Sequence, residues 1–246
     1  MGSSSAGRVE VASLSTAGAD RPEKFYEYAA AGIVMDYWVG QGKVSLRMAG
    51  SSSRGRRRAP VAELFPPQGQ WTEEDYFALP ATNRYVELSD GELIMPPHPT
   101  FRHQEALKRL FLRLNAFVEE HDLGVVQLAP LPVRLWPGKI REPDIFFIAG
   151  EHADRVGEQA CGVPDLIVEV TSASMARLDR LEKFYEYARA GVKEYWIVDP
   201  DARAVEVYGL EGGAYLLRGR WGPGETAASG LLKGFEVRVD DVVGGS

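Results

Sequence analysis

The chain has 246 residues, 45% of them hydrophobic, which is enough for one large domain or for one domain of ordinary size with an extension. Its formal net charge of -7 argues against polyanion binding by the whole surface, so any contact with nucleic acid must use local basic patches. Its single cysteine, Cys161, excludes a disulfide framework and a multi-cysteine metal site. Because no apolar run approaches the roughly 18 residues of a membrane span and no signal peptide is recognisable, we expect a cytoplasmic protein without membrane contact.

The first segment of the chain repeats a later one. Residues 9–32 align without a gap to residues 168–191, with roughly 17 of 24 positions identical, and the alignment pairs Glu10 with Glu169 and Lys24 with Lys183. Two copies this far apart do not make a solenoid, which needs at least about three stacked units. We therefore interpret residues 1–47 as a truncated, loosely ordered duplicate of a strand-helix-strand unit, placed ahead of a complete domain.

A compositional change separates the two copies. Residues 48–70 are rich in Ser, Gly, Pro and Arg, which is typical of a flexible linker. Four arginines in it could touch nucleic acid, although a solvated linker is the stronger expectation: Arg54, Arg56, Arg57 and Arg58. The complete domain is then expected over residues 71–246.

The first elements of that domain are a short helix and a hairpin. Thr72 is a good N-cap with Asp75 three positions on, so a short helix is expected directly after it. Residues 85–88 and 92–95 read as two short strands joined by a Ser-Asp-Gly turn.

A longer helix is expected over residues 100–121, after a proline-rich break. Its apolar stripe comprises Ala106, Leu107, Leu110, Leu114, Phe117 and Val118. Its other positions include the basic residues Arg102, Lys108, Arg109 and Arg113, a face that is usually only solvated. Two short strands within residues 125–136 and one strand over residues 140–148 follow.

Residues 163–200 form the part on which the rest of the domain depends. A continuous apolar run over residues 166–168 predicts a strand buried on both faces, and Glu169 follows it directly. A helix is expected over residues 174–190, with a packing stripe of Leu181, Phe184, Tyr185 and Ala188 and a neighbouring face of Asp179, Lys183 and Tyr187. Further strands are predicted over residues 204–210, 214–217 and 235–239. The domain is therefore expected to be mixed α/β, with a central sheet and two principal helices.

Three acids lie at strand ends or in the hairpin: Glu87, Asp144 and Glu169. Paired carboxylates with a lysine nearby suit a divalent cation and a phosphate substrate, because hard cations prefer oxygen ligands. On spacing alone, unrelated surface acids and a surface pair of Asp179 with Lys183 remain open alternatives.

The ordered motifs of this domain resemble a known family. YVELSDGELIM, REPDIFFI, VPDLIVEVTSAS and DRLEKFYEYARAGVKEYWIVDP are similar to the Uma-two family of restriction endonucleases, within the PD-(D/E)xK nuclease superfamily. The resemblance covers nearly everything from Trp71 to the end of the chain. It implies a restriction-endonuclease-like core with a mixed central sheet flanked by helices, a magnesium-dependent phosphodiesterase site, and DNA as the substrate.

Carried over residue by residue, the resemblance implies that Asp144 and Glu169 are metal ligands, with the carbonyl of Val170 as a third oxygen. The superfamily places a lysine two residues after the second acid, where this chain has Thr171. The resemblance implies that Lys183, on the following helix, takes that role.

Two further residues match polar positions of the family pattern. Glu87 is assigned to metal binding or to positioning of water, and His103 is a further candidate for the catalytic site. Asp165 follows a proline as Asp144 does, but it is expected to cap the entry to its strand rather than to bind metal.

The expected function is hydrolysis of DNA by a metal-activated water, with Mg²⁺ as cofactor, Mn²⁺ as a substitute, and Lys183 stabilising charge. The alternative is a catalytically inactive nuclease-fold protein that binds DNA or has a regulatory role. A third interpretation is a decayed gene product whose N-terminal fusion spoils folding. DNA is the expected partner, and homodimerisation stays open.

Overall fold

The computed structural model divides the chain into two units, Met1–Phe65 and Pro66–Ser246. It describes the backbone of residues 25–30, 33–38 and 47–48, and residues 66–79, 85–171 and 177–244, with side chains from Pro66 on except those of residues 177–180. Glu10, the linker arginines and the side chains of Lys24 and Asp179 therefore lie outside the described part. The interpretations placed on them stay predictions.

The described part of the first unit contains strands, where the duplication predicts a helix. β1 (Phe25–Ala30) pairs antiparallel with β2 (Ile33–Trp38), which also pairs with β3 (Arg47–Met48). The matching segment of the second copy, FYEYARA, is helical. Aromatic residues are as compatible with a strand as with a helix, so the same short sequence takes the conformation that its surroundings favour.

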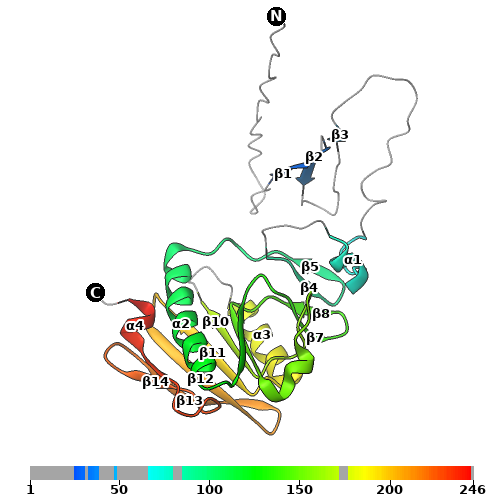
Figure 1. Cartoon of the computed structure of the whole chain (residues 1–246). Coiled ribbons are helices and arrows are strands. Elements are labelled where there is room, and N and C mark those ends of the chain that lie inside the picture. Colours follow the sequence, from blue (N-terminus) through cyan, green and yellow to red (C-terminus); the bar gives the residue numbers. More distant parts are fainter. Residues whose placement is uncertain are drawn as a thin grey trace, which may run out of the picture. The chain divides into compact units, whose positions relative to one another are not determined.

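A six-stranded mixed sheet forms the centre of the second unit, in the order β13-β12-β11-β10-β9-β6 (Figure 1). β10 and β11 are parallel, and the other neighbours are antiparallel. The strands are β6 (Gly124–Leu128), β9 (Ile145–Ala149), β10 (Leu166–Val170), β11 (Glu194–Asp199), β12 (Ala204–Glu211) and β13 (Ala214–Trp221). The mixed α/β fold with a central sheet is thus as predicted.

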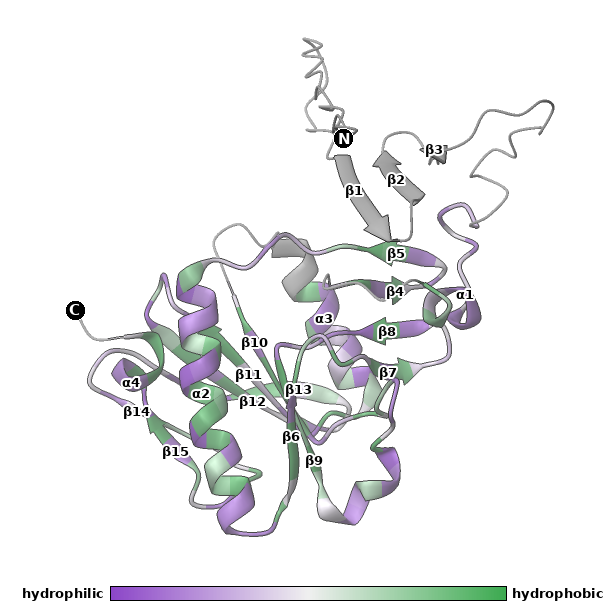
Figure 2. Cartoon of the chain, turned by 45° about the horizontal axis from the view of Figure 1, so that its top comes forward, coloured by the Kyte–Doolittle hydropathy of each residue, from purple (hydrophilic) through white to green (hydrophobic). Residues whose placement is uncertain are grey.

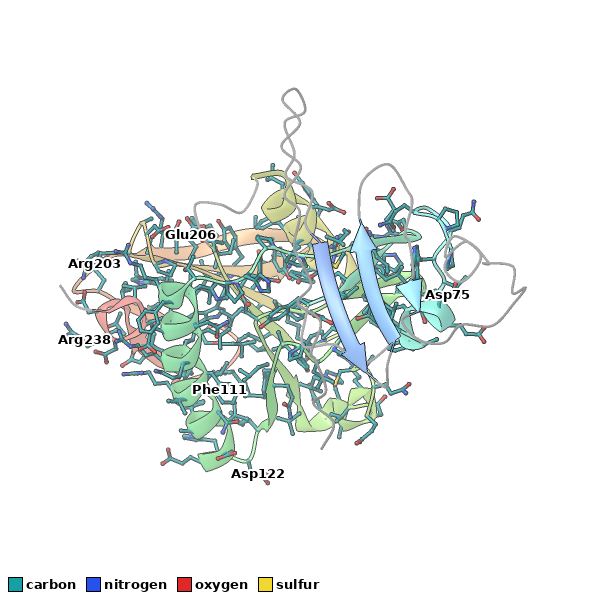
Figure 3. All side chains as sticks on the ribbon, turned by 90° about the horizontal axis from the view of Figure 1, so that it is seen from above. Asp75, Phe111, Asp122, Arg203, Glu206 and Arg238 are labelled. Carbon is teal, nitrogen blue, oxygen red and sulfur yellow. The ribbon has the colours of Figure 1, made fainter. Side chains whose placement is uncertain are left out.

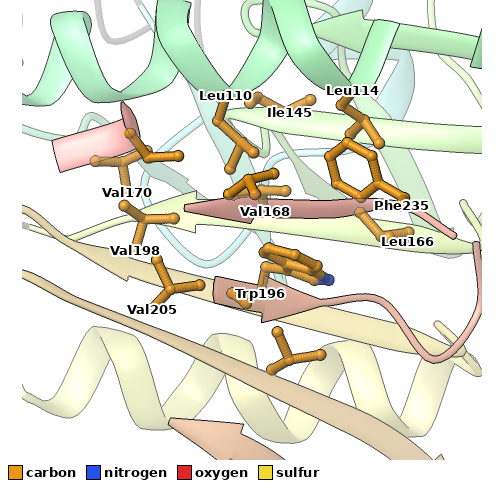
Figure 4. Packing of buried hydrophobic residues seen from close by; sticks show 14 of the residues in the cluster. Leu110, Leu114, Ile145, Leu166, Val168, Val170, Trp196, Val198, Val205 and Phe235 are labelled. Atoms are coloured by element: carbon orange, nitrogen blue, oxygen red, sulfur yellow. The ribbon is translucent and has the colours of Figure 1, made fainter. Parts of the chain in front are cut away.

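The two long helices cover opposite faces of this sheet. α2 (Phe101–Glu120), which begins after the N-cap Thr100, packs with one set of strand residues, and α3 (Arg177–Ala190) packs with the alternate set. The α2 side includes Ile145, Phe147, Leu166, Val168, Val170 and Trp196, most of which are labelled in Figure 4. The α3 side includes Phe146, Ile148, Ile167, Tyr195 and Ile197. Since both faces are covered there, the central strands β9, β10 and β11 are mostly apolar, and much of their length is green in Figure 2.

A second sheet of four short strands, in the order β5-β4-β8-β7, carries the predicted hairpin. Its strands are β4 (Glu87–Ser89), β5 (Glu92–Ile94), β7 (Val133–Trp136) and β8 (Lys139–Arg141). The prediction of a single strand over residues 140–148 is therefore wrong, because these residues are divided between β8 in this sheet and β9 in the large sheet. Pro143 lies at the break, because proline lacks the N–H that a continuous ladder requires.

The start of this unit lies before the predicted one. The N–H groups of Gly69 and Trp71 both donate to the carbonyl of Gly91, at 2.8 and 3.0 Å, so residues assigned to the linker are tied to the hairpin. α1 (Glu73–Phe77) follows, and Thr72 and Asp75 form the predicted capping box.

The predicted packing stripe of α3 is wrong in part. Leu181 and Tyr185 are exposed, Tyr185 by 69%, whereas Lys183, Glu186 and Tyr187 are buried. The helix thus turns charged side chains towards the protein, which is stable only where other charges compensate them.

The end of the chain adds β14 (Thr226–Ala228), β15 (Glu236–Arg238) and α4 (Val239–Val243), of which only the last strand was predicted. Arg203 donates from Nη2 to Asp240 Oδ1 at 3.0 Å and so holds α4; Figure 3 labels Arg203 and Arg238 beside this helix. In the part of the chain that the structure describes, no helix has the length and apolarity to span a bilayer.

Asp165 has the structural role that the sequence predicts. Its Oδ2 accepts the Ala149 N–H and bonds His152 Nδ1, each at 2.9 Å, and Lys193 Nζ lies 2.9 Å from Oδ1. Burial alone would raise the pKa of Asp165, but these contacts outweigh it and lower the pKa below 3.8.

We expect Asp165→Asn to lower the free energy of unfolding at pH 7 by about 2–4 kcal/mol, because the amide carries no charge for Lys193. A lowered pKa gives stability that is present above the ordinary pKa and lost as the pH falls through the folded-state value. The deficit should therefore shrink in acid, which urea unfolding at pH 7 and at about pH 2 measures. An equal deficit at both pH values would contradict this assignment.

Candidate active site

Asp144 and Glu169 lie side by side near one end of β9 and β10, two neighbouring interior strands of the large sheet. β9 and β10 are antiparallel with Val168 opposite Ile145, so the next step along each strand brings Glu169 opposite Asp144. The Val170 N–H donates to Asp144 Oδ2 at 2.7 Å and fixes this neighbourhood. Glu169 has the same strand parity as Ile167 and so faces α3. The pairing of these two acids, expected from the resemblance, is present.

Glu169 is 3% exposed and surrounded by polar side chains. Its Oε1 accepts the Tyr187 hydroxyl at 2.6 Å and the Lys183 ammonium at 3.3 Å, both from α3. Burial raises the pKa of Glu169 to about 7; Lys183 acts against this shift and the charge of Asp144 adds to it. Because Lys183 and Asp144 act on this pKa in addition to burial, the ionisable groups of the cluster interact with one another.

Lys183 lies between two carboxylates. Its Nζ is 3.1 Å from Glu87 Oε1 and 3.3 Å from Glu169 Oε1, and the residue is 4% exposed. Glu87 comes from β4 of the small sheet, and its pKa is lowered because the charges of Lys183 and Arg141 outweigh the effect of burial. The structure thus brings Glu87, Glu169 and Lys183 together from three different elements.

His103 joins the cluster from the first turn of α2. Its Nε2 lies 3.2 Å from Asp144 Oδ2, while its Nδ1 is buried with no hydrogen-bond partner among the described residues. Burial acts to lower the pKa of His103, but the hydrogen bond and charge of Asp144 outweigh it, so that the net shift is upward.

Sequence reasoning missed several buried charged residues beside this cluster. Arg141 on β8 is fully buried against Glu87 and Glu186, and Lys139 on the same strand is buried against Glu186. Glu142 accepts the Val86 N–H and the Tyr76 hydroxyl, at 3.2 and 3.3 Å, and burial together with the charge of Glu87 raises its pKa to about 8. The sequence shows three charged residues within Lys139–Glu142, but nothing local shows that they are buried.

The donor set fits a hard divalent ion. Both bonds to Asp144 fall on Oδ2 and both bonds to Glu169 fall on Oε1, so each carboxylate has a second oxygen outside those bonds. Within the described residues no three His, Cys, Asp or Glu side chains form a ready-made metal cluster. Two carboxylates plus waters are a common donor set for Mg²⁺, whereas a structural zinc site needs more protein ligands.

Two other features lie apart from the cluster. A cavity of about 630 Å³ is lined by Phe77, Arg134, Glu158, Gln159, Ala160, Cys161 and Gly162, none of them a predicted site residue. The basic residues of α2 face acids: Arg102 lies near Asp201, Lys108 and Arg109 near Glu105, and Arg113 near Asp241. This face of α2 is therefore largely neutralised.

Comparison with known proteins agrees with the motifs. A family model, Uma2, described as "Putative restriction endonuclease", matches residues 73–240. A crystal structure of a "putative nuclease belonging to DUF820" from Anabaena variabilis superposes with a TM-score of 0.60 at 20% identity, covering 70% of this chain and 97% of that one. At this identity the likeness shows the fold alone. No curated protein matches the chain.

Proposed function

The chain belongs to the Uma2 family, and from this membership and the geometry of the cluster we propose that it is a metal-dependent endonuclease that hydrolyses DNA. The observation that carries the proposal is the convergence of Asp144, Glu169 and Lys183 in one buried cluster near the ends of two neighbouring strands. In α/β proteins, ligand-binding and catalytic residues commonly lie at the ends of the strands. Neither a lone acid nor a surface ion pair would require these three residues to meet.

Asp144 and Glu169 would hold Mg²⁺ or Mn²⁺, with the carbonyl of Val170 as a third oxygen. Such an ion, when bound, lowers the pKa of a coordinated water and neutralises charge on phosphorus. Tyr187 and Lys183 orient the Glu169 carboxylate by their hydrogen bonds to Oε1. The Glu169 carboxylate is thereby aligned before any ligand arrives.

Lys183 would stabilise the negative charge that develops on the phosphate oxygens, as a preorganised cation does in a site that excludes water. Glu87 was expected to bind metal or to position water. Its oxygens face Lys183 and Arg141, so we assign it to holding the Lys183 ammonium. His103 would keep Asp144 oriented through its Nε2.

The direct test is metal-dependent nicking of DNA. Incubated with supercoiled plasmid, the purified protein should produce open circles in Mg²⁺ or Mn²⁺ and none in excess chelator, because the water is activated only beside the ion. Calorimetric titration with Mg²⁺ should show uptake by the protein without DNA. Folded protein that cuts nothing with either ion would contradict the proposal.

The alternative is a nuclease-fold protein that binds DNA without cutting it. The deep burial of Lys183 and Glu169 favours it, because a scissile phosphate would have to reach groups that are only 4% and 3% exposed. DNA binding that persists in chelator, with no heat of Mg²⁺ binding, would support this alternative over the first.

A further inference from the structure

Arg141 is the most completely bonded charge in the described part of the site. It has no exposed surface, and its guanidinium is held by carboxylates of three residues. Nη1 donates to Glu87 Oε2 at 2.8 Å, Nε and Nη2 donate to the two oxygens of Glu186 at 2.7 and 3.0 Å, and Nη2 also reaches Glu182 Oε1 at 3.1 Å. The forked contact with Glu186 fixes the plane of the guanidinium.

The partners of Arg141 are the groups that determine where Lys183 lies. Glu182 and Glu186 flank Lys183 on α3, so Arg141 anchors the helix on both sides of that residue. Glu87 uses Oε2 for Arg141 and Oε1 for the Lys183 ammonium. Arg141 therefore controls both the backbone that carries Lys183 and the carboxylate that receives its amine.

We propose that Arg141 is a positioning residue: it fixes the Lys183 ammonium between Glu87 and Glu169. The inference rests on the proposed function, since Lys183 matters for catalysis only if the site cleaves DNA. Lysine cannot replace this arginine, because one ammonium cannot span Glu186 and Glu87 with the geometry of a planar fork. A displacement of about 1 Å at a reacting group can cost on the order of 100-fold in rate.

Lys139 provides a matched control on the same strand. It is also buried, and its Nζ lies 2.7 Å from Glu186 Oε1 and 2.7 Å from Asp90 Oδ2, with Ser89 Oγ at 2.6 Å. It thus ties β8 to α3 as Arg141 does, but its contacts do not include Glu87. A purely structural role for the buried charges predicts similar effects at both positions, whereas the positioning role predicts different ones.

The first experiment compares Arg141→Lys with Lys139→Met in steady-state cleavage. Arg141→Lys should lower kcat by about 10- to 100-fold with KM changed by less than about threefold. Lys139→Met, although the harsher substitution for folding, should leave kcat within about threefold of wild type. Equal losses of kcat in the two variants, at matched thermal stability, would overturn the proposal.

A second readout is independent of cleavage and so separates failure of this inference from failure of the proposed function. Acylation of Lys183 by an amine-reactive ester, followed by peptide mass spectrometry, should be slow in wild type because the ammonium is buried between carboxylates. Arg141→Lys should speed it by about tenfold or more, and Lys139→Met by less than about threefold. If Arg141→Lys does not fold, Glu87→Gln weakens the same link and should also speed acylation. Unchanged acylation in both variants would overturn the proposal even if the protein does not cut DNA.

Discussion

Asp144→Asn is expected to reduce plasmid cleavage in Mg²⁺ by at least about a thousand-fold while leaving the protein folded. The amide has the size of the carboxylate, and its oxygen can still accept the Val170 N–H that now bonds Asp144 Oδ2 at 2.7 Å. It lacks the negative charge that a hard cation requires from its ligands. Single-turnover cleavage of supercoiled plasmid, with calorimetric titration of Mg²⁺, measures both consequences.

Asp165→Asn is the matched control for this experiment. Each aspartate follows a proline, is buried and accepts a backbone N–H, from Val170 in one case and Ala149 in the other. Asp165 lies in a different cluster, with His152 and Lys193, so its substitution should cost stability and leave kcat within about threefold. A thousand-fold loss in Asp165→Asn, or wild-type cleavage by Asp144→Asn, would remove Asp144 from the proposed metal site.

Most of the fold follows from local patterns in the sequence. The apolar run at β10, the apolar stripe of α2 and the capping box of α1 each have a local physical cause, and each element is found where expected. The errors arise where tertiary structure decides. An apolar stripe on α3 through Tyr185 is a sound expectation only if the buried face is wholly apolar, and here Lys183 and Glu186 are buried as well.

The candidate site was predictable in its acids and not in its support. Glu169 directly follows the apolar run of β10 and Asp144 directly precedes β9, and such positions near strand ends are visible in a sequence. Arg141 could not be recognised in this way, because an arginine near a strand end is usually solvated. Its role depends on Glu87 and Glu186, which are 54 and 45 positions away. A contact between distant segments leaves no local signal.

Lys183→Met is expected to lower cleavage by about 100- to 1000-fold and to make folding stability depend on pH. Methionine fills the space of the lysine stem but leaves Glu87 and Glu169 facing each other without the cation that now lies 3.1 and 3.3 Å from them. Breaking a buried pair in this way costs about 3–5 kcal/mol when the remaining acids are ionised. Lys139→Met, which removes an equally buried lysine outside the cluster, should keep its activity.

The pH dependence of this deficit has a defined direction. The pKa of Glu169 is already raised to about 7 by burial, and loss of Lys183 removes the main influence that lowers it. The folded-state pKa of this acid exceeds its ordinary value of 4.5, so the folded protein favours the protonated acid. The stability that this gives is fully present below pH 4.5 and is lost as the pH rises through the folded-state pKa. Urea unfolding of Lys183→Met should therefore show the smallest deficit below about pH 4.5 and the largest above about pH 8. If the loss in free energy of unfolding stays constant over this range, Lys183 does not compensate the charge of buried carboxylates. That result would also contradict the electrostatic role assigned to Lys183 at the site.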